Sequence, residues 1–575
     1  MYSDKENVNI LTALLADHGI CHAVVCPGSR NAPIVHNLNE HPHITCYAVT
    51  DERSAGFYAL GMSLSLRQPV AVCVTSGTAL LNLAPAVAEA YYQQVPLVVV
   101  SADRPQQWID QLDGQTLPQG DALGRFVRKA VTLPEYKPQP DSTGKENRSE
   151  EERWYCNRLV NEALLSLTHG PVHINVPISQ PLFGFTTARL PKVRTVRLQH
   201  FPADDVAVEA LSTFLQSSRP MLLIGQTMLT ACQREYLEDI RQRIVVLHES
   251  LAGVEKQGAV HFDEALPLIK DRTADYMPDC ILYLGGTFVS KRLKAFLRSG
   301  HCYGIRVSAD EHFADTFMNT DILLQSSGET VLRRIARACR DGRYEDCHDD
   351  YLPLGASTDF HSRWTALIEQ AARHAESHEP PYSQMAAVKA FEQQLPQIIK
   401  DPHAVAVHYA NSQSIRLANI YARRQVYCNR GVNGIEGSLS TAAGFSCVTG
   451  QRVFCVIGDL SFFYDQNALW NQNLRGNLRI LLLNNGKGGI FNMLKGLEQS
   501  PARDRYVAAA HQTTAEGICQ QNHVGYRQAA DMQQMQESIH WLIQTESEHP
   551  LLLEVLTNAD EDEHAVAGYY HSLSI

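Results

Sequence analysis

The strongest candidates for chemistry in this sequence are an aspartate and an asparagine that each follow a short apolar run. Asp459 follows the run 453–457, and Asn485 follows the run 480–483. Each run is rich in Val, Ile or Leu, which is typical of a buried strand. A carboxylate and an amide carbonyl are hard oxygen donors that suit Mg²⁺ sharing its shell with phosphate oxygens. The pair predicts a metal and phosphate site, although two helix caps at strand ends explain the spacing equally well.

The residues around this pair indicate how the chain would position it. Residues 465–475, between the two apolar runs, have the composition of a helix, so the stretch predicts a strand–helix–strand unit. Its polar residues then lie at the carboxyl ends of parallel strands, the edge at which ligands bind in an open sheet. Four glycines allow the backbone to approach a phosphate closely: Gly458, Gly486, Gly488 and Gly489.

Composition excludes several classes of protein. With 575 residues, 44% of them hydrophobic and 19% charged, the chain is typical of a globular protein of about three domains. A net charge of −12 argues against non-specific nucleic-acid binding. No apolar run reaches the ~18 residues of a membrane helix, and the polar start MYSDKENVNI lacks the apolar core of a signal peptide. The 14 cysteines never form C-x-x-C, which predicts reduced thiols in a cytoplasmic protein.

Alternating strand and helix patterns predict an α/β fold with three doubly wound parallel-sheet domains, at 1–190, 205–350 and 385–575. In the first domain, polar clusters follow the strands predicted at 23–27, 44–49, 70–75 and 97–102, and these clusters should converge on one edge of the sheet. A final strand is expected at 172–178, and helices are expected at 7–19, 52–66 and 79–93. The polar segment 136–152 predicts a surface loop.

The other two domains show the same alternation. Strands are predicted at 221–225, 243–250, 280–286 and 302–308 in the second domain, where no G-x-G-x-x-G indicates a dinucleotide site. The third domain is expected to contain strands at 404–412, 425–429, 452–459, 479–485 and 551–557. Residues 190–205, 341–360 and 377–384 are predicted to be linkers. Lys291 and Arg292 follow a predicted strand, and on their own a solvated helix start explains them better than a binding site.

Motifs in all three domains resemble those of the MenD family of thiamine-diphosphate enzymes. Gly458-Asp459 followed by Asn484-Asn485 resembles the diphosphate–metal motif of thiamine-diphosphate enzymes in general. Leu460 stands where that motif usually has Gly, and GDLS followed by YDQNAL is similar to the MenD branch. The other matching motifs are CPGSRNAPI, DERSAGFYALG, TSGTA, SADRP with GQ ten residues later, SKR, NS-x-x-x-R and NRG-x-x-GI-x-G-x-LSTAAG.

This resemblance implies a specific activity. Members of the family are 2-succinyl-5-enolpyruvyl-6-hydroxy-3-cyclohexene-1-carboxylate (SEPHCHC) synthases of menaquinone biosynthesis. They decarboxylate 2-oxoglutarate on thiamine diphosphate and add the succinyl-semialdehyde carbanion to isochorismate. The three domains would then be a pyrimidine-binding, a central and a diphosphate-binding domain.

The resemblance also implies roles for individual residues. Glu52 would be the catalytic acid that exchanges a proton with the aminopyrimidine ring, and Ile435 would hold the cofactor bent. Asp459, Asn485 and the backbone carbonyl near Lys487 would hold Mg²⁺ or Mn²⁺, although Lys487 interrupts the glycine-rich stretch of the family. The full set of implied cofactor residues is Glu52, Ile435, Gly458, Asp459, Leu460, Ser461, Asn485, Lys487, Gly488 and Ile490.

Both implied substrates carry two carboxylates, which fixed cations recognise well. The implied substrate residues are Ser29, Arg30, Arg104, Gln115, Lys291, Asn411, Ser412, Arg416 and Arg430. In the family, Glu52 of one chain meets the metal anchor of another, so a homodimer is the expected minimum unit, with a homotetramer as the alternative. Nucleic acid and membrane are not expected partners.

Two other hypotheses remain open at this point. One is a different thiamine-diphosphate enzyme, similar to acetolactate synthase or an oxalyl-CoA decarboxylase. The GDLS sequence and the many cationic positions argue against it, because a small neutral substrate needs few cations. The other is a non-enzymatic protein that keeps the fold as a scaffold. The presence of both Glu52 and Asp459 argues against that hypothesis.

Overall fold

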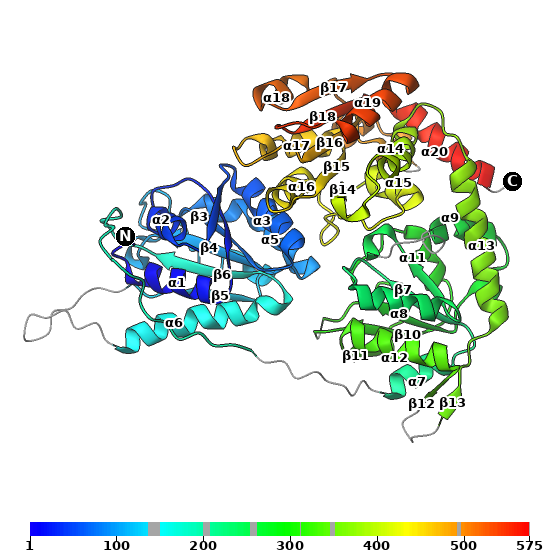
Figure 1. The fold of residues 1–575 in the computed structure, drawn as a ribbon, viewed down its shortest axis with the longest axis horizontal. Helices are drawn as coiled ribbons and strands as arrows, with labels where there is room; N and C mark the ends of the chain where they lie inside the picture. The colour runs from blue at the N-terminus through cyan, green and yellow to red at the C-terminus, as the bar shows by residue number, and fades with distance from the viewer. Residues whose placement is uncertain are drawn as a thin grey trace, which may run out of the picture.

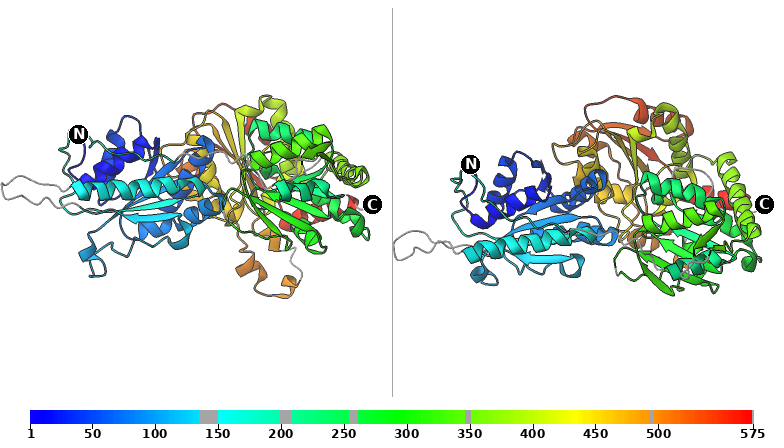
Figure 2. Two further views of the ribbon diagram at one scale, coloured as in Figure 1. Left: turned by 90° about the horizontal axis from the view of Figure 1, so that it is seen from below. Right: turned by 60° about the horizontal axis from the view of Figure 1, so that its bottom comes forward.

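The computed structural model describes residues 1–135, 150–198, 208–253, 261–310, 312–345, 351–491 and 496–573. In these residues, three parallel sheets covered by helices on both faces form three α/β units (Figure 1). This confirms the predicted fold class, while the limits of the three domains stay a prediction. Figure 2 shows from two further sides that the first unit lies at one end and the other two lie together at the opposite end. Among the described residues, no helix is long and apolar enough to cross a membrane.

The first unit contains a six-stranded parallel sheet in the order β2-β1-β3-β4-β6-β5. Its strands are β1 (His22–Val25), β2 (Thr45–Ala48), β3 (Val70–Val74), β4 (Leu97–Asp103), β5 (Lys129–Thr132) and β6 (Val172–Pro177). One face is covered by α1 (Glu6–Asp17), α2 (Ala32–Glu40) and α6 (Glu150–Leu165), and the other by α3 (Glu52–Leu66), α4 (Thr78–Asn82) and α5 (Ala84–Gln93). Strands β3 and β4 are buried along their whole length, as their unbroken apolar runs require in a sheet covered on both faces.

The second unit contains a five-stranded parallel sheet in the order β11-β10-β9-β7-β8. Its strands are β7 (Pro220–Ile224), β8 (Val245–His248), β9 (Cys280–Leu284), β10 (Tyr303–Ser308) and β11 (Ile322–Gln325). One face packs against α7 (Val208–Gln216), α8 (Ala231–Arg241) and α12 (Gly328–Asp341), and the other against α9 (Phe262–Ile269), α10 (Thr273–Tyr276), α11 (Lys291–Arg298) and α13 (Thr358–Ser377). An antiparallel pair, β12 (Arg343–Glu345) and β13 (Tyr351–Pro353), lies beside it.

The third unit contains a five-stranded parallel sheet in the order β14-β15-β16-β18-β17. Its strands are β14 (Val405–Tyr409), β15 (Arg452–Gly458), β16 (Leu478–Asn484), β17 (Gly525–Ala529) and β18 (Leu551–Leu556). One face is covered by α14 (Gln384–Ile398), α15 (Gln413–Tyr421), α19 (Met532–Gln544) and α20 (Ala559–Leu573), and the other by α16 (Ser438–Cys447), α17 (Asp459–Tyr464) and α18 (Glu516–Gln521).

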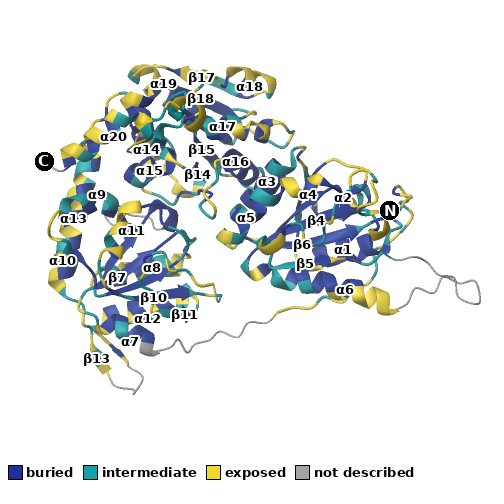
Figure 3. Ribbon diagram, turned by 180° about the vertical axis from the view of Figure 1, so that it is seen from behind, coloured by how far each residue is buried: buried dark blue, intermediate teal, exposed yellow. Residues whose placement is uncertain are grey.

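Helices α3 and α16 join the first and third units through one continuous apolar core (Figure 3). The two helices approach closely because small residues lie where they cross. A Cβ atom at Gly61 would clash with the Thr441 carbonyl, and one at Gly444 would clash with the Tyr58 carbonyl. The Tyr58 hydroxyl also donates to the Ala468 carbonyl at 2.6 Å. The first unit is therefore fixed against the third unit of its own chain.

The helix predicted at 465–475 is wrong. Helix α17 ends at Tyr464 and only a short 3-10 turn, η7 (Gln466–Leu469), follows it. The buried Asp465 carboxylate instead accepts hydrogen bonds from the backbone and the hydroxyl of Ser440, both at 2.7 Å. Asn467 and Asn473 donate to Asp51 and to the Ala48 carbonyl of the first unit. Contacts with other parts of the fold therefore override the local preference for a helix.

The strand predicted at 425–429 is also wrong, since only Tyr427 forms an isolated bridge, to His408. The backbone of Tyr427 bonds to β14, but its two neighbours bond to the second unit, because Val426 donates to the Ser250 carbonyl and the Cys428 carbonyl accepts from Gln226. The helix predicted at 79–93 is divided into α4 and α5 next to Pro85.

The predicted surface loop and the first linker are described only in part. Residues 136–149 of the loop predicted at 136–152 lie outside the described residues, and its last three residues begin α6. In the linker predicted at 190–205, residues 190–198 have no regular structure, and the rest lies outside the described part of the chain.

Candidate active site

A cavity of about 410 Å³ lies at the carboxyl-end edge of the third sheet. It is formed by the segments that follow β14, β15 and β16, by the loop before α16, and by the start of α20. Thirteen of the implied cofactor and substrate residues line it: Asn411, Ser412, Arg416, Arg430, Ile435, Gly458, Asp459, Leu460, Ser461, Asn485, Lys487, Gly488 and Ile490. The parallel strand order explains this convergence, because all these segments leave the sheet at the same edge.

Asp459, at the end of β15, joins the two turns that follow β15 and β16. Its side chain is 5% exposed, and its Oδ2 accepts hydrogen bonds from the backbone of Gly486 at 2.8 Å and of Asn485 at 3.2 Å. The Nε2 atom of His511 lies 3.4 Å from the same oxygen. This contact with the carboxylate raises the pKa of His511. The Asp459 carboxylate is thus the polar centre of the cavity wall.

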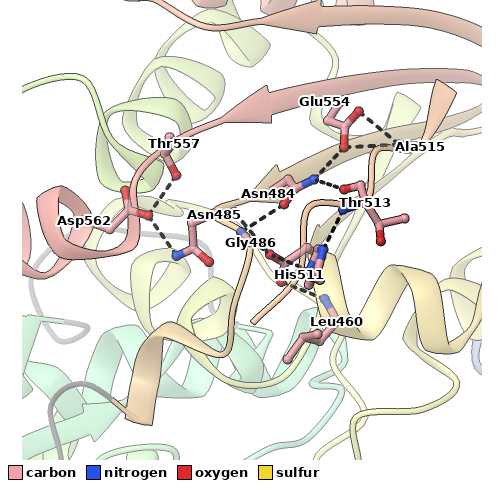
Figure 4. A network of polar contacts seen from close by, with 11 residues as sticks. Leu460, Asn484, Asn485, Gly486, His511, Thr513, Ala515, Glu554, Thr557 and Asp562 are labelled. Atoms are coloured by element: carbon pink, nitrogen blue, oxygen red, sulfur yellow. Dashed lines mark hydrogen bonds and ion pairs between the residues drawn. The ribbon is translucent and has the colours of Figure 1, made fainter. Parts of the chain in front are cut away.

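The two adjacent asparagines at the end of β16 point in different directions (Figure 4). Asn484 is directed inward, where its Nδ2 donates to the buried Glu554 at 2.7 Å and to the Thr513 carbonyl at 2.9 Å. Asn485 lines the cavity, and its Nδ2 donates to Asp562 at 2.9 Å. Of the pair, Asn485 is therefore the residue that can offer its amide oxygen to a ligand.

Lys487, which interrupts the glycine-rich stretch, has a clear structural place. Its ammonium group lies 3.2 Å from the Asp560 carboxylate in the first turn of α20. The turn before it needs a glycine, since Gly486 has a φ angle of +76°. The Gly486 carbonyl also accepts from the His511 backbone at 2.7 Å. The lysine side chain therefore fastens this turn to α20.

The loop 429–435 carries two of the predicted residues, Arg430 and Ile435. Asn411 holds the loop by donating to the Asn429 and Gly434 carbonyls and by accepting from Arg430 at 3.1 Å. The Ile435 carbonyl accepts from the Ser461 hydroxyl at 2.6 Å, while the Ile435 side chain is 45% exposed. A large apolar side chain thus remains uncovered at the cavity.

Two guanidinium groups, of Arg416 and Arg430, contribute positive charge to the cavity wall. Burial, followed by repulsion from Arg430, lowers the pKa of Arg416. The Nε atom of Arg430 is buried and has no hydrogen-bond partner within the described chain. Two neighbouring cations, one of which has an unpaired Nε atom, are suited to bind an anionic ligand such as a carboxylate.

The first unit gathers a second group of predicted residues at the carboxyl-end edge of its own sheet. These residues are Ser29, Arg30, Glu52, Arg104 and Gln115. Burial, followed by repulsion from Arg104, lowers the pKa of Arg30, and Arg104 pairs with Asp113 at 2.6 Å. The half-buried Glu52 begins α3 directly after Asp51, whose side chain caps that helix by accepting from Ser54.

None of these five residues lines the cavity of the third unit in the same chain. Lys291 does not line it either; it is exposed at the start of α11, next to Arg292, whose guanidinium lies 4.2 Å from the ring centroid of Tyr570 on α20. One chain therefore presents two separate groups of predicted site residues.

Several residues around the cavity were not predicted from the sequence. Gln384, Asn433, Asp562 and Glu563 line it, and Glu89 of α5 fixes the loop 429–435 from the first unit. Asp562 stands in an acidic run, ADEDEH, that is typical of a solvated helix start. Glu89 stands in an ordinary apolar helix pattern. No local signal distinguishes either residue.

Comparison with known families agrees with this geometry. The model for the thiamine pyrophosphate enzyme N-terminal TPP binding domain matches residues 6–123, and the C-terminal TPP binding domain model matches residues 410–555. The first match contains all five residues gathered at the edge of the first sheet, and the second contains the thirteen residues at the cavity. The fold and the site thus define a thiamine pyrophosphate (thiamine diphosphate) enzyme.

Similarity to curated relatives shows the family to which the chain belongs within this class of enzymes. The chain is 42% identical to the 2-succinyl-5-enolpyruvyl-6-hydroxy-3-cyclohexene-1-carboxylate synthases of Bacteroides thetaiotaomicron and Bacteroides fragilis, over 100% of both chains in each case. It is 32% identical to the synthase of Flavobacterium psychrophilum, over 97% of this chain and 96% of the relative. The chain belongs to the 2-succinyl-5-enolpyruvyl-6-hydroxy-3-cyclohexene-1-carboxylate synthase family.

Proposed function

We propose that this protein is a thiamine-diphosphate-dependent carboligase of menaquinone biosynthesis. It decarboxylates 2-oxoglutarate and joins the resulting four-carbon unit to isochorismate, forming SEPHCHC and carbon dioxide. Full-length similarity to curated synthases supports this proposal. The observation that carries it is the single cavity that combines Asp459 and Asn485 with the guanidinium groups of Arg416 and Arg430. An enzyme similar to acetolactate synthase is not favoured, because its monocarboxylate substrates would need fewer cations than two dicarboxylates.

The residues of the cavity fit a diphosphate that is held through a divalent cation. Asp459 and the Oδ1 atom of Asn485 are hard oxygen donors of the kind that Mg²⁺ or Mn²⁺ binds, and the backbone carbonyl of Lys487 would be the third protein ligand. A Cβ atom at Gly458 would meet nothing within 4 Å. The backbone there is therefore open to close approach by a phosphate.

Glu52 and Ile435 have complementary roles in this proposal. Thiamine diphosphate, when bound, would supply the nucleophilic carbon and the electron sink that the decarboxylation needs. The Glu52 carboxyl group would hold and exchange a proton at the aminopyrimidine ring of the bound cofactor. The uncovered side chain of Ile435 would pack against the cofactor and support it in the cavity.

The remaining predicted residues bind the substrate carboxylates. Arg416, Arg430, Asn411 and Ser412 act from the third unit. Arg guanidinium groups suit this task because they bind carboxylates in a bidentate way. The first unit adds Ser29, Arg30, Arg104 and Gln115, and the second unit adds Lys291. Together these groups would orient the two substrates, and the bound substrates would displace water from the cavity.

We further propose that two chains complete each site, so that a homodimer is the minimum active unit and a homotetramer is an assembly of such dimers. The separation of the two groups of predicted residues within one chain supports this arrangement. A cytoplasmic location is also part of the proposal, because the 13 described cysteines are free thiols.

The direct test of this function is a reaction with the purified protein, thiamine diphosphate, Mg²⁺, 2-oxoglutarate and isochorismate. We expect isochorismate to disappear in step with carbon dioxide release, and we expect no isochorismate loss when pyruvate replaces 2-oxoglutarate. Release of carbon dioxide from pyruvate without any loss of isochorismate would favour an enzyme similar to acetolactate synthase. No consumption with either keto acid would refute the carboligase proposal.

A further inference from the structure

The side chain of Asn485 can help to bind a cation only if its amide oxygen faces the cavity. A carboxamide has an oxygen on one side and an NH₂ group on the other, and only the oxygen can ligate a metal ion. A half turn of the amide would present N–H groups to the cation instead. The structure therefore needs a group that fixes the orientation of this amide.

Asp562, on α20, is that group (Figure 4). Its Oδ2 accepts hydrogen bonds from Asn485 Nδ2 at 2.9 Å and from the Thr557 hydroxyl at 2.8 Å. Its Oδ1 accepts from the backbone of Gln384 at 2.8 Å. The side chain is 8% exposed, and its three donors come from three different segments of the third unit. Its position is therefore fixed on every side.

Because Asp562 is a carboxylate, it determines which side of the Asn485 amide faces it. An ionised Asp can only accept hydrogen bonds, so Asn485 must turn its NH₂ group toward Asp562. Within the described residues, no group donates to Asn485 Oδ1. That oxygen lies on the other side of the amide, and Asn485 lines the same cavity as Asp459.

Asp562 is not needed to cap its own helix. Asn558 performs that function, since its Oδ1 accepts from the backbone of Asp560 at 2.9 Å and of Glu561 at 3.3 Å. The carboxylate of Asp562 is directed instead to Asn485, Thr557 and Gln384. Its place in the first turn of α20 thus does not explain its contacts.

We propose that Asp562 is a positioning residue that holds the carboxamide of Asn485 with its oxygen toward the cation that binds the cofactor diphosphate. This inference rests on the proposed function, because it concerns the same cation. Loss of a partner that orients a metal ligand typically weakens metal affinity by about 10- to 100-fold. The effect should therefore appear in cation binding itself, and not only in turnover.

The first variant is Asp562→Asn, which keeps the shape of the side chain. Its carbonyl can still accept from Gln384, and its new NH₂ group then faces Asn485. The Asn485 amide must turn to offer its oxygen to that group, which leaves N–H groups toward the cavity. We expect Mg²⁺ affinity in the presence of thiamine diphosphate to fall by about 10- to 100-fold, as measured by calorimetry on the full-length protein.

Two further variants separate positioning from general damage to the fold. Asn485→Asp places two carboxylates side by side, and its Mg²⁺ affinity should also fall. In the double variant Asn485→Asp with Asp562→Asn, the new Asp accepts from the new Asn and still offers an oxygen to the cavity. The net charge is the same as in the wild type, and we expect the double variant to recover most of the lost affinity.

Glu561→Gln is the matched control, since it removes a charge from the exposed neighbouring position of α20 and should bind Mg²⁺ like the wild type. Thermal unfolding without ligands checks that each variant is folded. If Asp562→Asn fails to fold, the comparison of Asn485→Asp with the double variant still decides whether residue 562 orients the side chain at position 485.

Three results would overturn the inference: wild-type affinity in Asp562→Asn, no recovery in the double variant, or an equal loss in Glu561→Gln. A wild-type protein that binds neither thiamine diphosphate nor Mg²⁺ would instead refute the proposed function. The two kinds of failure are therefore distinguishable.

Discussion

Asp459 has a structural role, and in our proposal the same carboxylate also binds the cation. Its Oδ2 holds the turn at Asn485 and Gly486 through two backbone hydrogen bonds, and the same group faces the cavity. We therefore expect Asp459→Ala to weaken the binding of thiamine diphosphate and of Mg²⁺ together, by at least about tenfold. Calorimetric titration of each ligand measures this effect. Normal affinity for both ligands would contradict the role of Asp459 as the metal anchor.

Glu52 is expected to act in proton transfer and not in cofactor affinity. Glu52→Gln keeps the size of the side chain but cannot release a proton. We expect carboligation to fall by about 10²- to 10⁴-fold, while thiamine diphosphate still binds with nearly wild-type affinity. Steady-state rates and fluorescence titration separate the two effects. An unimpaired rate would show that Glu52 is not the proton-transfer group.

The sequence predicted the residues whose type and position both carry information. Asp459 and Asn485 each end an apolar run, so their place at a sheet edge could be predicted before the structure was known. Asp562 and Glu89 act through contacts with residues far away in the chain, to Asn485 and to Gly431. Such contacts depend on how elements pack, and no local pattern reveals them.

Helix α5 of the first unit positions a loop of the third unit. The Glu89 carboxylate, 2% exposed, accepts hydrogen bonds from the backbone of Gly431 and Val432, both at 2.6 Å. These bonds fix the loop that carries Arg430. Removing the acceptor from a buried charge-assisted hydrogen bond costs on the order of 1.5–3 kcal/mol. The first unit thus shapes the candidate site of its own chain indirectly.

We expect Glu89→Ala to lower kcat/KM for isochorismate by about tenfold or more, because the loop loses both acceptors. Glu89→Gln keeps one acceptor, so its kcat/KM for isochorismate should lie between the values of Glu89→Ala and the wild type. Steady-state kinetics at saturating cofactor measure kcat/KM for the two variants and the wild type. Wild-type kcat/KM in both variants would contradict the role of Glu89 in fixing the loop.

The start of α11 provides a test that depends on pH. Glu249 accepts hydrogen bonds from the backbone of Val289 and Ser290, both at 2.7 Å, just before Lys291. Burial raises the pKa of Glu249 from 4.5 to about 7. The folded protein therefore keeps this proton at pH values at which the unfolded chain has lost it. The resulting stability is complete below about pH 4.5 and is lost as the pH rises through about 7.

The glutamine in Glu249→Gln cannot titrate, so this variant loses the part of the pH dependence of stability that comes from Glu249. Relative to the variant, the wild type should lose thermal stability as the pH rises from about 4.5 to about 7, by roughly 3 kcal/mol at most. Unfolding midpoints of both proteins across this range measure the difference. A difference in Tm that stays constant with pH would contradict the raised pKa of Glu249.

At the scale of elements, the sequence predicted the buried parts of the fold best. Strands β3 and β4 and helix α3 agree with prediction because their apolar patterns are set by burial. The segments at 425–429 and 465–475 differ from prediction because their polar and backbone groups bond to other units. Edge strands such as β5 and β11 are partly exposed and only 4 residues long, so their sequences carry little periodic pattern.

At the scale of the whole molecule, one chain carries two groups of predicted site residues, and the group in the first unit does not line the cavity of the third. The third unit contributes the cavity around Asp459, and the first unit contributes the group around Glu52. The packing of α3 on α16 fixes the two units relative to each other. We therefore propose, as the central claim, that a second chain brings its Glu52 to the cavity of the first.

Mixing the two inactive proteins Glu52→Gln and Asp459→Ala tests this claim most directly. In a mixed dimer, the chain with intact Asp459 meets the chain with intact Glu52, which makes one complete site and one doubly defective site. After random exchange of subunits, about one quarter of wild-type carboligation should return, because half of the dimers are mixed. No recovery of activity, with subunit exchange demonstrated by mass spectrometry of differently tagged chains, would contradict a site shared between two chains.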